Sequence, residues 1–353
     1  MSDLTFLSTD HWQFLHNKPT AFAQFKQYPE DFCVEEIPSY ELTGEGEHIY
    51  LWLQKRNLNT AFVAEQLAKF LKLPLRAVTY AGRKDKYALT TQYFAVHLPG
   101  KAVPDWQTFA LEGVTILSAT RHNKKLRTGS LNGNKFGIVL RDVNDMDAVI
   151  ERLEQIKISG VPNYYGPQRF GNNNSNLHLA EKLLAGEEIR NRNKRSLCIS
   201  ALRSWLFNQY ISQRLQTNQF GIPQQGDAMM LSGSNSFFIA EDIDTTLQNR
   251  LATNDICISA PLWGRGELAT QGEVQLFEQA IAQEYPAICT GLEELGLKQE
   301  RRAIKVITTD LNWVVDKDIL NLSFTLPPGC FATSVLREAI QLSPTVSHDV
   351  EAQ

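Results

Sequence analysis

Alternating apolar and polar positions predict β-strands in two parts of the chain. In the first 140 residues the alternation is interrupted by Pro29 and by several glycine-containing turns. It returns after Arg301-Arg302, close to the carboxyl end. The segments expected to form strands are 22–28, 32–37, 48–53, 75–80, 91–98, 113–119, 136–140, 303–308, 313–315 and 320–326.

Apolar residues three and four positions apart predict helices between and beside these strands. The expected helices cover 60–71, 145–156, much of 176–220, 274–284 and 332–341, and residues 162–174 form a long loop rich in turn-forming residues. Because strands and helices do not alternate regularly, the pattern predicts an α+β fold rather than a doubly wound one. It also predicts a strand-rich core with a more helical insertion.

Composition adds a domain count and excludes some classes of protein. A chain of 353 residues exceeds the size at which one hydrophobic core usually stops growing, so two domains are expected. Its five cysteines are widely spaced and form no C-x-x-C, which gives no sign of a disulfide framework or a zinc knuckle. No apolar run is long enough to span a membrane, and residues 1–20 are too polar for a signal peptide, so we expect a cytoplasmic protein.

The net charge of −4 conceals an uneven distribution. Acidic residues are concentrated in 30–47, and basic residues in 121–127 and 190–195. Because local basic patches set the contact with phosphates, an RNA partner is compatible with this chain. The run Arg190 to Arg195 fits a contact with a nucleic-acid backbone and a solvated face equally well.

One loop gathers three cations around a single carboxylate. Asp85 lies among Arg83, Lys84 and Lys86, between two predicted strands. The cations favour the ionised form of the carboxyl group and attract phosphate oxygens. A charged carboxylate beside phosphate-attracting groups suits chemistry on a nucleotide. Taken alone, the same residues also fit a solvated hairpin loop.

The loop is part of an ordered set of motifs that resembles the TruD family of tRNA pseudouridine synthases. The family pattern G-x-K-D-x-x-A-x-T-x-Q is matched at 82, 84, 85, 88, 90 and 92. Four further stretches resemble the other family motifs in the same order: 26–36, 133–141, 163–171 and 326–338. The matches extend from Lys26 to Glu338, which is nearly the whole chain.

The resemblance implies a domain organisation. Residues 1–159 and 306–353 would form a pseudouridine-synthase-like catalytic domain, with a mixed, mainly antiparallel sheet flanked by helices. Residues 160–305 would form the family's insertion domain, which is more helical and also α+β.

The resemblance also implies a reaction and its catalytic residues. A pseudouridine synthase detaches uracil from ribose, turns the base and rejoins it through C5, so the product is an isomer and neither cofactor nor metal is required. Asp85 would be the catalytic carboxylate and Lys26 the cation that pairs with it. Whether Asp85 adds to the sugar or the base, or first removes a sugar proton, stays open. Each role requires an ionised carboxylate.

Six further residues are candidates for binding the substrate. A flipped base requires stacking partners, for which Phe32 and Phe331 rank above Phe136 because each lies beside a chain break. Asn134 offers an amide to the uracil edge, and Gln168 and Arg169 could position RNA. Each has a structural alternative: core packing for the phenylalanines, a turn for Asn134, and loop fastening for Gln168 and Arg169.

The substrate implied by the resemblance is tRNA, with uridine 13 of the D arm as the target. We expect a monomer with no membrane association and no obligate protein partner. Two rivals remain. One is a tRNA-binding or RNA-folding protein without catalysis, and the other is a hydrolase that pairs Asp85 with Glu36 or Glu47.

Overall fold

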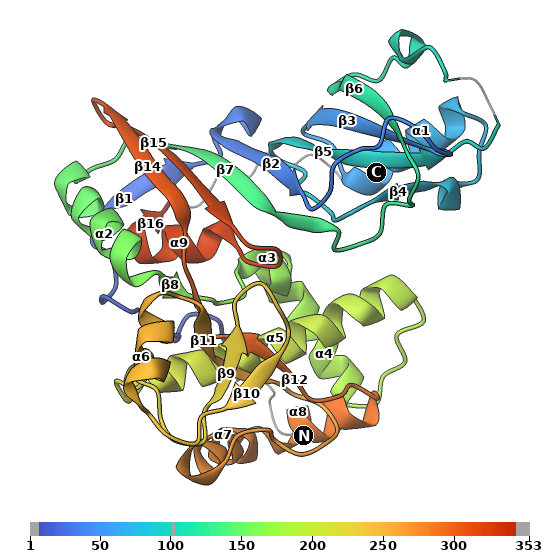
Figure 1. The fold of residues 1–353 in the computed structure, drawn as a ribbon. Coiled ribbons are helices and arrows are strands. Elements are labelled where there is room, and N and C mark those ends of the chain that lie inside the picture. Colours follow the sequence, from blue (N-terminus) through green and yellow to red (C-terminus); the bar gives the residue numbers. More distant parts are fainter. Residues whose placement is uncertain (1–6, 101–102, 344–353) are drawn as a thin grey trace. The chain divides into compact units, whose positions relative to one another are not determined.

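The computed structural model describes residues 7–100 and 103–343, which divide into two compact units (Figure 1). The sheet unit comprises Thr20–Lys157, Thr308–Gly329 and 339–343. The helical unit comprises 7–19, Ile158–Ile307 and Cys330–Glu338. Each unit is therefore assembled from segments that are far apart in the sequence, and both contain helices and strands.

The sheet unit is built on one ten-stranded mixed sheet, whose main strand order is β14-β15-β7-β2-β5-β3-β6. Its strands are β1 (Phe22–Phe25), β2 (Phe32–Pro38), β3 (His48–Arg56), β4 (Val78–Tyr80), β5 (Leu89–His97), β6 (Val114–His122), β7 (Leu131–Arg141), β14 (Thr309–Asp316), β15 (Ile319–Leu326) and β16 (Gln341–Leu342). The pairs β2–β5 and β1–β16 are parallel and the other pairs are antiparallel. The predicted α+β fold with a mainly antiparallel sheet is confirmed.

Helices and short 3-10 turns complete the sheet unit: η1 (Pro29–Asp31), α1 (Thr60–Phe70), η2 (Leu75–Ala77), η3 (Trp106–Thr108) and α2 (Met146–Ser159). Helix α1 buries Val63 and Leu67, as its spacing predicts, against Leu51, Leu53 and Phe94 of the sheet. Removing these large apolar side chains from water is the main term that favours this packing.

The helical unit surrounds one long helix with a small sheet and shorter helices. Its elements are β8 (Val161–Pro162), α3 (Pro167–Phe170), η4 (Asn172–Asn174), α4 (Ser175–Leu184), α5 (Arg192–Gln216), β9 (Ala228–Leu231), β10 (Phe237–Ile239), α6 (Thr245–Ala252), β11 (Ile256–Leu262), α7 (Gly272–Glu284), α8 (Pro286–Glu294), β12 (Glu300–Ala303), β13 (Lys305–Val306) and α9 (Ala332–Ala339). Trp205, Leu206 and Phe207 are consecutive in α5 and all fully buried, so the middle of this helix is enclosed on every side. Strands β10, β9, β11 and β12 form an antiparallel sheet in that order.

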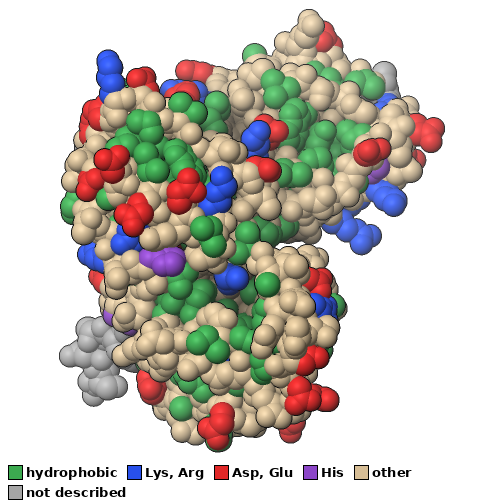
Figure 2. Space-filling model, turned by 60° about the vertical axis from the view of Figure 1, so that its left-hand side comes forward, with side chains coloured by type: hydrophobic (Ala, Val, Ile, Leu, Met, Phe, Trp, Pro, Cys, Tyr) green, Lys and Arg blue, Asp and Glu red, His purple; other side chains and the backbone are tan. Residues whose placement is uncertain are grey.

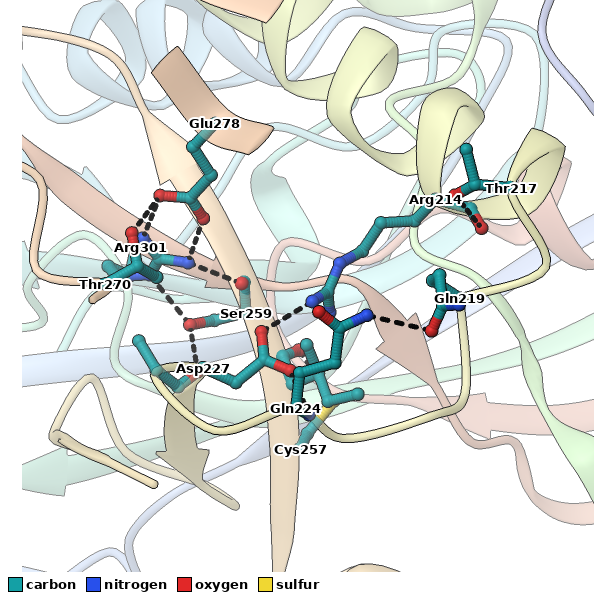
Figure 3. A network of polar contacts seen from close by, with 12 residues as sticks. Arg214, Thr217, Gln219, Gln224, Asp227, Cys257, Ser259, Thr270, Glu278 and Arg301 are labelled. Atoms are coloured by element: carbon teal, nitrogen blue, oxygen red, sulfur yellow. Dashed lines mark hydrogen bonds and ion pairs between the residues drawn. The ribbon is translucent and has the colours of Figure 1, made fainter. Parts of the chain in front are cut away.

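Two buried ion pairs lie inside the helical unit (Figure 3). Arg301 on β12 contacts Glu278 on α7 at 2.7 Å, and Thr270 donates to the same carboxylate at 2.6 Å. Arg214 on α5 contacts Asp227 at 2.6 Å. Buried charges of this kind require partners of good geometry, so these pairs fix how α5 and α7 meet the small sheet.

Several elements differ from the sequence prediction for local reasons. The predicted strand 75–80 begins with the 3-10 turn η2 after Pro74, so only Val78–Tyr80 pairs with β5. The predicted strand 303–308 is divided, because β12 pairs with β11 whereas β13 pairs with β8. The predicted loop 162–174 contains the short helix α3. The strands β9, β10 and β11 and the helices α6 and α8 were not predicted.

All five cysteines lie in the described residues and are free thiols. No helix in the described ranges combines the length and the apolar character needed to cross a membrane. Figure 2 shows acidic and basic side chains mixed over one face, with apolar side chains between them.

Two glycines of β7 allow a matched test of the sheet. A Cβ at Gly133 would lie 2.5 Å from the carbonyl oxygen of Leu326 on β15, whereas a Cβ at Gly137 would meet only the Cys33 side chain at 3.5 Å. We expect Gly133→Ala to lower the free energy of unfolding by about 1–3 kcal/mol because the backbone must move. Gly137→Ala should change it by less than about 1 kcal/mol. Urea unfolding of both variants measures the difference, and equal effects would contradict the close β7–β15 approach.

Candidate active site

The carboxylate of the candidate site is carried by the loop 81–88, which joins β4 to β5. Both ends of this loop are anchored, because Ala81 and Ala88 are almost fully buried. Between them Arg83 and Lys86 are exposed. The two ends of the loop are therefore held in the protein interior, while the Arg83 and Lys86 side chains are exposed to solvent, as expected for cations that could attract phosphates.

Asp85 and Lys26 are brought together, although 58 residues separate them in the chain. The Lys26 Nζ lies 3.5 Å from the Asp85 Oδ1, and the Asp85 side chain is 40% exposed whereas that of Lys26 is 18% exposed. Burial lowers the pKa of Lys26, and the attraction of Asp85 opposes that shift. A cation that is largely shielded thus supports a carboxylate that a solute can reach.

Phe32 lies directly beneath that cation. The Lys26 Nζ is 4.0 Å from the centroid of the Phe32 ring, a distance suited to cation–π attraction. The Phe32 and Phe136 rings are stacked with centroids 6.0 Å apart, on the neighbouring strands β2 and β7. Phe32 is 4% exposed and Phe136 is 6% exposed. The Phe32 ring thus contacts the cation that pairs with Asp85, and both rings present little area to solvent.

A second lysine of the loop is buried in a polar group behind Asp85. The Lys84 Nζ lies 3.2 Å from the Glu36 Oε2 and donates to the Asn134 Oδ1 at 2.7 Å. Burial raises the pKa of Glu36, and the charge of Lys84 opposes that shift. Since an ammonium can only donate, the Asn134 amide must turn its oxygen toward Lys84. The amide NH₂ is therefore the end of Asn134 that is left to face other groups.

Lys55 is a buried residue beside the Asp85 loop that the sequence motifs did not single out. Its side chain is fully buried at the end of β3, and its Nζ donates to the carbonyl oxygens of Asp85 and Leu58, each at 2.7 Å. Burial lowers the pKa of Lys55 to about 8, partly offset by the attraction of Asp85 and reinforced by Lys84. The main chain of the candidate catalytic residue is thus held by a buried amine.

The remaining three candidates lie together in the helical unit. The Arg169 Cζ is 5.1 Å from the Tyr165 ring centroid and 5.7 Å from that of Phe331, and the Arg169 Nη1 donates to the Ser200 Oγ at 2.8 Å. Gln168 is exposed and accepts a hydrogen bond from Thr333 at 3.3 Å. Phe331 is partly buried, so this cluster combines a guanidinium with aromatic rings.

The basic run 190–195 forms the start of α5. Asn191 caps the helix by accepting a hydrogen bond from the Lys194 N–H at 3.0 Å, and Arg190 pairs with Glu188 at 3.5 Å. Both groups are exposed, so the arrangement leaves the two predicted alternatives for this run open.

The arrangement around Asp85 is unsuited to hydrolysis by paired carboxylates. Glu36 is shielded from solvent and is paired with Lys84. Glu47 is paired with His97 at 3.2 Å. Glu36 therefore lacks the access to solvent that a second catalytic acid needs. Glu47 precedes β3, at the opposite end of that strand from Lys55, which binds the Asp85 carbonyl. Over the described residues, no group of three or more His, Cys, Asp and Glu side chains is arranged to hold a metal ion.

One signal in the sequence could have identified Lys55. The residues Ile49, Leu51 and Leu53 alternate along β3 on the face that packs against α1, and Lys55 occupies the next position of that apolar series. A lysine at a predicted core position requires an internal acceptor. The acceptors themselves, being main-chain carbonyls, leave no sequence signal.

The buried amine of Lys55 predicts a pH dependence of stability. An unfolded lysine has a pKa near 10.5. Between pH about 8 and about 10.5 the unfolded chain therefore binds more protons at this residue than the folded chain, so stability rises with pH. Relative to Lys55→Met, the wild-type free energy of unfolding should rise by up to about 3 kcal/mol across this window.

Urea unfolding of the wild type and Lys55→Met at pH 7.5, 9 and 10.5 measures this change. The exposed Lys69 on α1 provides the control, since Lys69→Met should follow the wild type at every pH. A wild-type minus Lys55→Met difference that stays constant or falls with pH would contradict the burial of a charged amine.

Comparisons with known proteins agree on one family. The family model described as "tRNA pseudouridine synthase D (TruD)" matches residues 10–192 and 188–339. A protein of Pseudoalteromonas atlantica called tRNA pseudouridine synthase D is 54% identical over 341 residues, covering 95% of this chain and 97% of that protein. A protein of Shewanella oneidensis with the same name is 46% identical, covering 93% and 88%.

The fold agrees as well. A crystal structure from Methanosarcina mazei, described as that of a tRNA pseudouridine synthase D, matches with a TM-score of 0.71 at 21% identity. The match covers 91% of this chain and 94% of that one. The motifs from Lys26 to Glu338, the family model and the relatives thus lead to one conclusion: this chain belongs to the TruD family of tRNA pseudouridine synthases.

Proposed function

We propose that this protein converts a uridine of tRNA to pseudouridine and that Asp85 is its catalytic carboxylate. The observation that carries the proposal is the pairing of a solvent-accessible Asp85 carboxylate with the largely buried Lys26 ammonium at 3.5 Å. Several relatives that cover most of this chain are named tRNA pseudouridine synthase D, which supports the same reaction.

The chemistry balances without any added reactant. The bond between uracil N1 and ribose C1′ breaks, a bond between uracil C5 and C1′ forms, and the hydrogen of C5 leaves as a proton while N1 gains one. An ionised Asp85 serves equally as a nucleophile toward the sugar or the base and as a base toward a sugar proton. Lys26 supports that ionised form in each case.

The groups beside Asp85 match the edge of a flipped uracil. We propose that the Asn134 amide NH₂ donates to a uracil carbonyl, because its oxygen is already held by Lys84 at 2.7 Å. Extruding a base from folded RNA costs a few kcal/mol, which stacking on aromatic rings offsets in part. Among the candidate rings, Phe32 and Phe136 expose little area to solvent. Phe32 would therefore act mainly by holding the Lys26 ammonium through cation–π attraction. Phe331 is the more exposed candidate for stacking.

The two units suggest a division of labour. We assign catalysis to the domain formed by 1–159 and 306–353, and RNA positioning to the insertion domain 160–305. The Asp85 loop lies in the sheet unit, and the Arg169 and Gln168 cluster lies in the helical unit. A guanidinium that is stacked on aromatic rings is well suited to hold a phosphate or a nucleobase.

The finer features of the proposal come from the family resemblance. The target would be uridine 13 in the D arm of tRNA, and the protein would act in the cytoplasm as a monomer. A tRNA-binding protein without catalysis is the remaining rival, and it differs from the enzyme in forming no pseudouridine.

Unmodified tRNA that carries tritium at uracil C5 tests the proposal, because rejoining through C5 releases the label. We expect the wild type to release tritium and Asp85→Asn to release it at least about 10³-fold more slowly, since an amide is neither nucleophile nor base. Asp147→Asn, an exposed aspartate of α2, is the matched control and should keep the wild-type rate.

Two further arms separate the alternatives. A tRNA with cytidine at position 13 should release no tritium if that position is the target. Release at the normal rate would show that another uridine is modified. Wild-type protein that binds tRNA but releases no label would favour the RNA-binding rival over the enzyme.

A further inference from the structure

The position of Lys55 is unusual for a structural lysine. It continues the apolar face formed by Ile49, Leu51 and Leu53 on β3, and none of its side chain is exposed. A buried ammonium is expensive unless all of its environment supports it. A leucine at this position would extend the core without that expense, so the lysine needs an explanation beyond packing.

The hydrogen bonds of Lys55 supply the explanation. Its Nζ bridges two carbonyl oxygens, that of Leu58 just after β3 and that of Asp85 in the loop 81–88, each at 2.7 Å. The amine therefore ties the main chain of the candidate catalytic residue to the end of β3. We propose that Lys55 is a positioning residue, which acts through the Asp85 carbonyl to set where the Asp85 carboxylate lies.

Two other buried side chains act on the same loop and support this role. The Thr60 hydroxyl of α1 accepts from the Lys84 N–H at 3.0 Å, and the Gln92 amide of β5 donates to the Gly82 carbonyl at 2.9 Å. Thr60 also donates to the Gln92 carbonyl oxygen at 3.1 Å. The main chain is thus held before Asp85 by a helix and a strand, and at Asp85 by Lys55.

Charge gives Lys55 a role that Thr60 and Gln92 cannot share. Both of its acceptors are neutral carbonyls, so its positive charge is not cancelled by the groups it binds. A buried charge is screened little by salt, and it acts on the adjacent Asp85 carboxylate together with Lys26. Lys55 thereby attracts the Asp85 carboxylate from inside the protein, while Lys26 does so beside the carboxylate.

The inference rests on the proposed function, since it assigns a part in the same reaction. A displacement of about 1 Å in a reacting group can slow a chemical step by about 10²-fold. We therefore expect Lys55→Met, which keeps the length and removes the donors, to lower the single-turnover rate by about 10²-fold. The dissociation constant for tRNA should change by less than about twofold, because Lys55 does not reach the surface.

Single-turnover tritium release with enzyme in saturating excess over tRNA is the test. The proteins compared are the wild type, Lys55→Met, Lys55→Arg as a variant that keeps charge and donors, and the exposed control Lys69→Met. Thermal melting and tRNA binding are measured on each. We expect the single-turnover rate of Lys55→Arg to be at least about tenfold higher than that of Lys55→Met. The rate of Lys69→Met should match that of the wild type.

A purely structural lysine would give the opposite pattern, with a lowered melting temperature but an unchanged rate per bound tRNA, and that result would overturn the inference. If Lys55→Met does not fold, Lys55→Gln, which keeps one amide donor, is measured in its place with the same criteria. A wild type that releases no tritium refutes the proposed function itself. An active wild type matched by Lys55→Met refutes only the role of Lys55.

Discussion

The proposed reaction depends on one carboxylate that is charged, accessible to substrate and held at a fixed place. Asp85 satisfies the first requirement through Lys26 at 3.5 Å, and the second through a side chain that remains 40% exposed. The third requirement, a fixed position, is met by Lys55, whose buried Nζ donates to the Asp85 carbonyl oxygen. An exposed loop would otherwise sample several conformations, and a reactive group gains most from a geometry that is set before the substrate arrives.

The fold explains how residues so far apart in the sequence meet. Strand β2 lies between β7 and the parallel partner β5, so Phe32 stacks on Phe136 while the β5 hairpin carries Asp85. Lys26 follows β1, which pairs with the far end of β7. The long strand β7 is therefore the common support of this site. Its alternation, with Phe136, Ile138 and Leu140 on one buried face, was visible in the sequence.

Sequence patterns predicted the local elements and the motif residues better than the contacts between them. The helix beginning at Thr60 was predicted, but the hydrogen bond that the Thr60 hydroxyl accepts from the Lys84 N–H was not. The buried Glu36–Lys84 pair was not predicted, because either residue alone is typical of a surface. Periodicity reports which face of one element is apolar. It carries no information about which distant strand or loop that face will meet.

Product stoichiometry is the measurement that best shows whether the protein rejoins uracil to ribose through C5. Single-turnover reactions on tritiated tRNA would be analysed for released label, pseudouridine in the RNA and free uracil. We expect one pseudouridine for each C5 hydrogen released and no free uracil, because the base never leaves the site. Free uracil in place of pseudouridine would identify a hydrolase, and tRNA bound without either product would contradict the assignment of catalysis to Asp85.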